Sequence, residues 1–349
     1  MNSVNFENQL FTVNKNIKIF LNYVVGPAVF CILSYSIYQQ IQRQPQWEES
    51  LQHIWDVVSW AKLKWGLLTG VLLLLNWGIE AKKWQIVINR IQPLSWYTSF
   101  KAICVGTTFA FFTPNRMGEY VGRVLYINEG QRVKAISLTL VCSMAQLMVT
   151  LVFGLVGIFI VKPVVEIQVG HQTAMLLQLL AYITAGALLI MSVLFFRLSR
   201  LIYWVQKLPM KAVIKEQIAV LDHFETNTLL RILLWSMVRF LVFMAQYFVC
   251  FKVFNVSLNV VDLFGAISVV FLILAIVPSI AFLSELGIRW KTNIEVLQLF
   301  STNLVGIMAS SLAVWIINLV IPALMGSLLL LNIRRFKYRQ QKRRKAQQL

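Results

Sequence analysis

Charged residues are scarce in this sequence. Asp, Glu, Lys and Arg make up only 13% of its 349 residues, about half of the share found in soluble domains. Hydrophobic residues account for 58%, and the mean hydropathy is +0.69. These values exclude a disordered protein and an ordinary soluble enzyme, and they indicate a polytopic membrane protein.

Acidic residues are scarcer than basic ones. The sequence has 14 Asp and Glu against 32 Lys and Arg, so its formal net charge is +18. Such an excess can favour nucleic acid, but no groove-reading motif accompanies it, and we expect no nucleic-acid partner. The basic residues are better explained as parts of cytoplasmic loops that face anionic lipid.

Residue types that hold metals or act as nucleophiles are also few. The 4 cysteines lie in apolar stretches, and the 3 histidines lack the spacing of metal ligands. We find no phosphate-binding loop, no G-x-S-x-G motif and no paired-carboxylate motif. We therefore expect no metal, no cofactor and no enzymatic activity.

Long runs without charged residues locate the expected membrane spans. Such runs are long enough, or nearly so, for a helix that rises about 1.5 Å per residue to cross a hydrocarbon core of about 30 Å. The six expected spans are residues 19–42, 63–80, 135–161, 174–196, 229–251 and 304–333. Two further apolar segments, residues 97–115 and 262–284, carry a proline at or near their ends and could either cross the membrane or return to the face of entry.

The distribution of basic residues helps to decide between these topologies. If both segments return, most of the 32 Lys and Arg residues lie on one side of the membrane, whereas two crossings divide them almost evenly. The positive-inside rule therefore favours two re-entrant segments and cytoplasmic termini. A topology in which only the second segment returns gives a weaker bias and stays open.

The favoured topology is an inverted repeat, a common architecture of transporters. Residues 1–161 and 174–333 would form the two membrane repeats, each with the order span, span, re-entrant hairpin, span, and residues 334–349 a basic cytoplasmic tail. The fold class expected is thus an all-α membrane helix bundle. The largest cytoplasmic loop, at residues 197–228, is amphipathic and basic and could receive a protein partner.

The most informative polar segment follows the first re-entrant helix. Pro114 removes a backbone donor at the end of that helix, and Gly118 allows a tight turn and a close backbone approach. The candidate binding residues at this tip are Asn115, Arg116, Glu119 and Arg123. The alternative is that the two arginines are ordinary cytoplasmic charges with Glu119 as their partner.

The second hairpin repeats this chemistry. Pro278 and Gly287 would shape it, with Glu285 and Arg289 as candidate binding residues. Because basic residues are disfavoured in outside loops, Arg289 needs a reason to be there. A third candidate, Arg239, lies within an apolar span at a cost of roughly 2.5–3.5 kcal/mol.

Other polar residues in the spans receive simpler interpretations. Arg239 would pair with Glu119 or Glu285, or lock helix packing in a buried pair. Glu80 is expected to mark the end of the second span. The single amides in the spans are expected to form interhelical hydrogen bonds; they are Asn76, Gln146, Gln246 and Asn318.

The run T-P-N-R-M-G-E followed by Arg123, and the later run P-x6-E-L-G-I-R, resemble the lysylphosphatidylglycerol synthase transmembrane-region family. The resemblance covers about residues 15–335, although the order Glu285-Leu286-Gly287 is a variant of the family's second motif. In bifunctional members this region is fused to a soluble aminoacyl transferase, which we do not expect here. The resemblance implies a flippase-like membrane protein that handles lipid without aminoacylating it.

We therefore expect an integral protein of a bacterial inner membrane that binds and translocates an anionic, phosphate-bearing lipid. Its arginines would bind the phosphate by charge-assisted hydrogen bonds. Two alternatives stay open. One is a non-transporting scaffold for a lipid or glycan enzyme, and the other is a membrane-embedded transferase.

Overall fold

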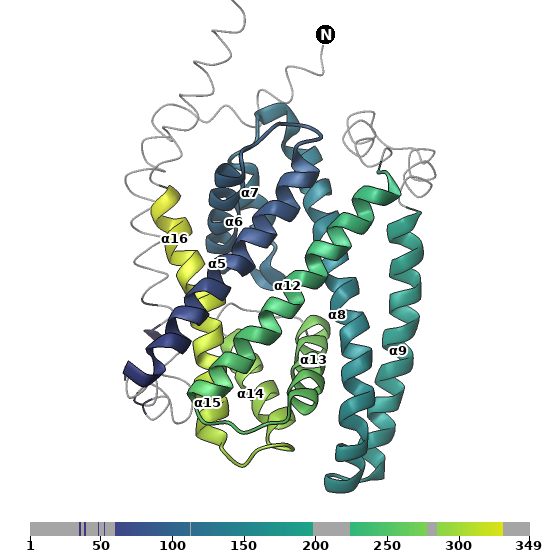
Figure 1. The fold of residues 1–349 in the computed structure, drawn as a ribbon. Helices are drawn as coiled ribbons and strands as arrows, with labels where there is room; N and C mark the ends of the chain where they lie inside the picture. The colour runs from purple at the N-terminus through teal and green to yellow at the C-terminus, as the bar shows by residue number, and fades with distance from the viewer. Residues whose placement is uncertain are drawn as a thin grey trace, which may run out of the picture.

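The computed structural model describes residues 60–111, 113–197, 224–277 and 285–330, with a few isolated positions before residue 60 (Figure 1). All regular structure in this part of the chain is helical. The helices are α5 (Trp60–Ile88), α6 (Trp96–Phe111), α7 (Gly118–Val124), α8 (Arg132–Gln168), α9 (His171–Phe196), α12 (Thr226–Val253), α13 (Val260–Ile276), α14 (Glu285–Leu297), α15 (Leu304–Trp315) and α16 (Ile321–Leu330). Short turns η2 (Pro114–Arg116) and η3 (Glu129–Gln131) flank α7, and a π-helical turn, η6 (Ile316–Val320), joins α15 to α16.

In the described part of the chain, four helical stretches are long and apolar enough to cross a membrane, which makes this an integral membrane protein. They are Glu129–Gln168, His171–Phe196, Thr226–Val253 and Leu304–Leu330. The expected span at residues 63–80 lies within α5, a helix of 29 residues. The expected span at residues 19–42 lies, isolated positions apart, outside the described residues. So do the basic tail and most of the loop at residues 197–228.

Helices α6 and α7 form an antiparallel hairpin. Gly118 lies directly against the carbonyl of Phe109, and a Cβ added to Gly122 would meet the Cα of Gly106 at 2.6 Å. The partner numbers fall along α6 as they rise along α7, so the two helices run in opposite directions. The glycines permit this close approach because any side chain would push the backbones apart.

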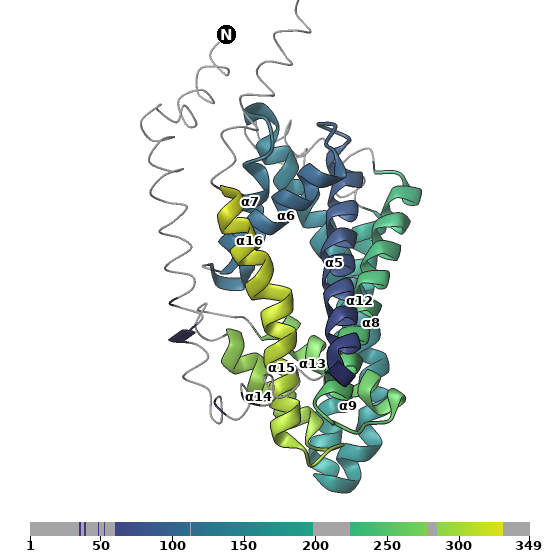
Figure 2. The same cartoon turned by 60° about the vertical axis from the view of Figure 1, so that its left-hand side comes forward.

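Each of the two short apolar helices packs against a candidate membrane-spanning stretch from the other half of the chain. Helix α6 packs on α16, where Thr108 Oγ1 donates to the carbonyl of Ala323 at 2.6 Å. Helix α13 packs on α8, where a Cβ on Gly157 would meet the carbonyl oxygen of Gly265 at 2.7 Å. In Figure 2, α6 and α7 lie in the upper half of the molecule, and α13 and α14 lie in the lower half.

The long helices α5 and α12 pack against each other and lie side by side in both views (Figure 1, Figure 2). Local signals set the ends of several helices. Gly170 ends α8 with a φ of 115°, a conformation that favours glycine, and Asn303 caps α15 by accepting from Gly306 N at 2.9 Å. A cluster of buried aromatic and aliphatic side chains joins α6, α14 and α15 through Phe111, Trp290 and Trp315. The two short-helix pairs, α6 with α7 and α13 with α14, therefore meet near the centre of the fold.

Candidate functional site

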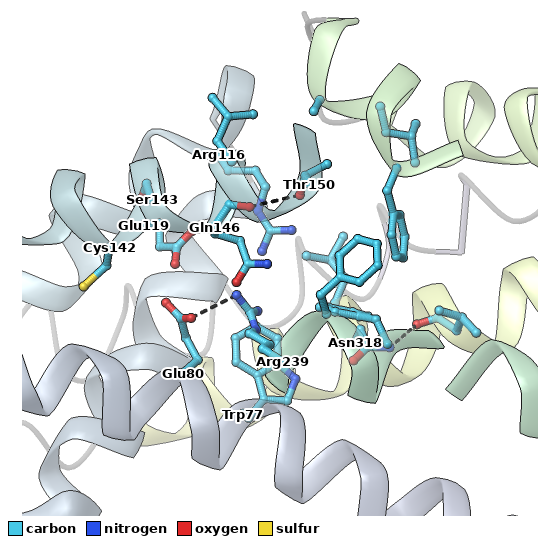
Figure 3. A pocket seen from close by; sticks show the side chains of 18 of the residues that line it. Trp77, Glu80, Arg116, Glu119, Cys142, Ser143, Gln146, Thr150, Arg239 and Asn318 are labelled. Atoms are coloured by element: carbon cyan, nitrogen blue, oxygen red, sulfur yellow. Dashed lines mark hydrogen bonds and ion pairs between the residues drawn. The ribbon is translucent and has the colours of Figure 1, made fainter. Parts of the chain in front are cut away.

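A cavity of about 470 Å³ lies between α5, α8, α12 and the two short-helix pairs. It belongs to the usual size range of ligand pockets. Its lining has a polar, charged side and an apolar side. The charged residues that line it are Glu80, Lys83, Arg116, Glu119, Arg239 and Arg289. Figure 3 shows Arg116, Glu119, Gln146, Glu80 and Arg239 around one common space.

Glu80 is the centre of the charged side. It is 4% exposed, and its Oε2 lies 2.8 Å from Lys83 Nζ and 2.9 Å from Arg239 Nη1. Its Oε1 lies 3.0 Å from an Nη2 of Arg123. One buried carboxylate thus pairs with three cations from α5, α7 and α12, an arrangement that offsets the desolvation cost of each.

Arg123 connects this centre to the first hairpin. Its guanidinium is buried and also pairs with Glu119, one turn earlier in α7. The structure therefore brings together Glu119 and Arg123, as the sequence suggested. Arg239 pairs with Glu80, so the expected pairing with Glu119 was wrong, whereas the alternative of a buried pair that locks helix packing fits this contact between α12 and α5. The side chain of Glu285 lies outside the described residues, and a pairing with it stays a prediction.

A chain of amides extends the site between helices. Arg239 Nε donates to Asn76 Oδ1 at 2.9 Å, and Asn76 Nδ2 donates to Asn318 Oδ1 at 2.5 Å. Asn318 in turn donates to Gln246 Oε1 at 2.9 Å. The expected interhelical hydrogen bonds are confirmed, and Gln146 takes part by accepting from Lys83 at 3.4 Å.

The tip of the first hairpin has an unusual backbone. Pro114 begins the η2 turn, and the next two residues, Asn115 and Arg116, have φ angles of 49° and 59°. Left-handed conformations are uncommon for residues with a long side chain and are found most often at functional sites. The left-handed positions are thus held by Asn115 and Arg116, while Gly118 serves the close approach of α7 to α6. This backbone aims Arg116 into the cavity (Figure 3).

The second hairpin contributes Arg289. This residue lies on α14, is half-buried and lines the cavity opposite the first hairpin. Gly287 lies two residues before it on the same helix. Glu285 begins α14, but its side chain lies outside what the structure describes, as does Pro278 with the rest of residues 278–284.

Aromatic and aliphatic side chains form the other wall of the cavity. The rings of Phe240 and Phe271 lie edge to face at 5.6 Å between centroids, and Phe243 meets the same Phe271 ring at 5.7 Å. Leu274, Val314 and Leu319 complete this wall. The cavity can therefore hold a molecule that is anionic at one end and apolar at the other.

Sequence reasoning missed Glu80 and Lys83 as site residues. Glu80 does not mark a helix end but lies well within α5, which continues to Ile88. A signal was present, because Asn76, Glu80 and Lys83 follow the spacing i, i+4, i+7 that places side chains on one helix face. The charges at 80 and 83 suggested a span boundary because the other partners of Glu80, Arg123 and Arg239, lie far away in the sequence.

The apolar helices define an integral membrane protein whose described regular structure is all helical, with a buried, cation-rich cavity between the helices. The described residues contain no group of three or more His, Cys, Asp or Glu that could hold a metal ion.

The chain belongs to the family described as the lysylphosphatidylglycerol synthase TM region, whose model matches residues 47–289. The resemblance seen in the two sequence runs is thereby confirmed. No curated protein matches the chain. The matched region includes both short-helix pairs as far as Arg289, and thus most of the residues that line the cavity.

Proposed function

We propose that this protein binds an anionic, phosphate-bearing lipid in the central cavity and translocates it across the membrane. The observation that carries the proposal is the composition of the cavity. Four cations line it beside two carboxylates, and an aromatic wall faces them. An amphiphile with an anionic headgroup matches both sides.

The proposed topology is six spans and two re-entrant hairpins in an inverted repeat. Two packing relations support it. The α6–α7 hairpin of the first repeat packs on α16 of the second repeat, and α13 of the second packs on α8 of the first. Such an exchange is what an internal two-fold relation between the halves would produce. We place the protein in a bacterial inner membrane with both termini in the cytoplasm.

In the proposed mechanism the hairpins act as two gates. Arg116 and Arg289 reach the cavity from opposite short-helix pairs and would bind the phosphate by charge-assisted hydrogen bonds. Glu80 and Glu119 hold the remaining cations in place. Movement of one hairpin at a time would expose the bound headgroup to one face of the membrane. The chain itself would carry out no covalent chemistry.

Reconstitution in liposomes tests the proposal. Headgroup-labelled phosphatidylglycerol and phosphatidylcholine would be followed by their accessibility to an impermeant quencher. We expect translocation of phosphatidylglycerol that falls in an Arg116→Gln/Arg289→Gln variant and persists in Arg231→Gln, a control at an exposed position of α12. No translocation of either lipid by folded protein would contradict the proposal and favour the membrane scaffold.

A further inference from the structure

The cavity also carries information about the charge of the headgroup. Resting on the function proposed above, we infer that the preferred ligand is a lipid whose headgroup is a phosphomonoester or diphosphate with two negative charges. A monoanionic phosphodiester and a zwitterionic headgroup fit the site less well.

The first argument is the charge balance of the described residues. The lining holds the cations Lys83, Arg116 and Arg239 against Glu80 and Glu119, an excess of one positive charge. Arg123, buried behind the two carboxylates, raises this excess to two. Arg289 is left out of the balance, because the carboxylate of Glu285, one turn before it in α14, lies outside the described residues. Uncompensated charge in a low-dielectric interior is costly. A dianion neutralises this excess, whereas a monoanion leaves one positive charge unmatched.

The second argument is the hydrogen-bonding capacity of the lining. Both oxygens of Glu80 already accept from cations, and Glu119 accepts from Arg123. The buried indole Nε1 atoms of Trp77 and Trp315, two lining residues, have no acceptor. The site therefore offers donors in excess of acceptors. A phosphomonoester adds acceptor oxygens, while the ammonium of a zwitterionic headgroup would add a further positive charge beside Lys83, Arg116 and Arg239.

The third argument concerns the source of the phosphate. Phe240, Phe243 and Phe271 form a continuous aromatic surface in the lining of the cavity. A free phosphate ester would leave this surface in contact with water. An apolar chain attached to the phosphate would cover it and add the free energy of apolar burial.

Binding of matched lipids to the full-length protein in phosphatidylcholine nanodiscs tests the inference. The probes are phosphatidic acid, phosphatidylglycerol and phosphatidylcholine with identical acyl chains, at about pH 8, where a phosphomonoester carries close to two charges. We expect phosphatidic acid to bind about tenfold more tightly than phosphatidylglycerol, the value of one added charge-assisted contact. Glycerol 3-phosphate should not displace it at comparable concentrations.

The variants Arg116→Gln and Arg289→Gln should each reduce the preference for phosphatidic acid, whereas Arg231→Gln should keep it. The variant Arg116→Lys retains the positive charge at this position. If it keeps the preference that Arg116→Gln loses, the loss comes from the missing charge and not from misfolding. Equal binding of phosphatidic acid and phosphatidylglycerol, with translocation intact, would overturn the inference and leave the proposed function standing. Displacement by glycerol 3-phosphate would show that the site takes a free phosphate ester. Failure to bind or move any lipid would remove both.

Discussion

Glu80 Oε2 accepts a hydrogen bond from Arg239 Nη1 at 2.9 Å, and this contact joins two helices across 159 residues of sequence. The side chains are 5% and 14% exposed. An arginine within an apolar helix thus finds its counter-charge on a neighbouring helix, and that carboxylate serves two further cations as well. The charged side of the cavity therefore depends on one residue more than on any other.

Replacement of Glu80 by Gln should destabilise the protein by about 3–5 kcal/mol, because the buried cations Lys83 and Arg239 lose their counter-charge and Arg123 is left with Glu119 alone among the described carboxylates. The free energy of unfolding in detergent would measure the effect. Glu129→Gln is the control, since Glu129 is 56% exposed and pairs with Arg132 on the surface. In a double-mutant cycle, Glu80→Gln/Arg239→Gln should recover part of the loss. Equal stability of Glu80→Gln and the parent would contradict this account.

The neighbouring lysines Lys82 and Lys83 should behave differently. Lys83 is 1% exposed and lines the cavity, whereas Lys82 is exposed and donates to Gln85 on its own helix. We expect Lys83→Gln to weaken binding of an anionic lipid by about tenfold, as loss of a charge-assisted contact would. Lys82→Gln should leave binding unchanged. A titration of both variants with the same lipid would measure the affinity. Equal losses of affinity in both variants would show that the charge of the surface, and not of the cavity, attracts the lipid.

The glycines at which the short helices pack closely against other helices should not tolerate replacement by alanine. Gly326 lies directly against the carbonyl of Cys104, and a Cβ on Gly157 would approach the carbonyl oxygen of Gly265. Gly326→Ala and Gly157→Ala should each cost about 1–3 kcal/mol through overpacking. Gly70→Ala and Gly186→Ala are controls, because nothing lies within 4 Å of an added Cβ at either position. Thermal unfolding in detergent would compare the two test variants with the two controls. Equal melting temperatures for all four would show that these contacts do not hold the short helices in place.

The backbone at Arg116 predicts an order of stability. Its φ is 59°, a conformation that costs a residue with a Cβ about 1–2 kcal/mol. Arg116→Gly should therefore be more stable than Arg116→Ala, although both variants lose the guanidinium and should bind lipid equally poorly. Chemical unfolding and lipid binding, measured on both variants, would test the two statements separately. An Ala variant as stable as the Gly variant would mean that the tip relaxes when its side chain is removed.

Several elements of the fold could be predicted from the sequence because their signals are local. A run of apolar residues such as 174–196 must form a helix in lipid, where each backbone group needs a partner within its own segment, and α9 spans His171–Phe196. Likewise, Gly118 predicted a close approach of two backbones, and the structure places it against the carbonyl of Phe109. The tip residues Asn115 and Arg116 were singled out for their polarity, but their left-handed conformation left no mark in the pattern.

The sequence by itself determined that this is a helical membrane protein with excess basic charge and arginines at two proline-containing segments, because hydropathy and charge are properties of each segment alone. Only the tertiary structure decided which charges meet. Glu80 pairs with Arg239 because α12 packs on α5, and with Arg123 because α6 packs on α5 and carries α7 against it in the first hairpin. In the sequence of one helix, a charged residue at a span boundary cannot be told from a buried counter-ion. The packing of the other helices decides between the two, because a charge in the low-dielectric interior needs an opposite charge beside it.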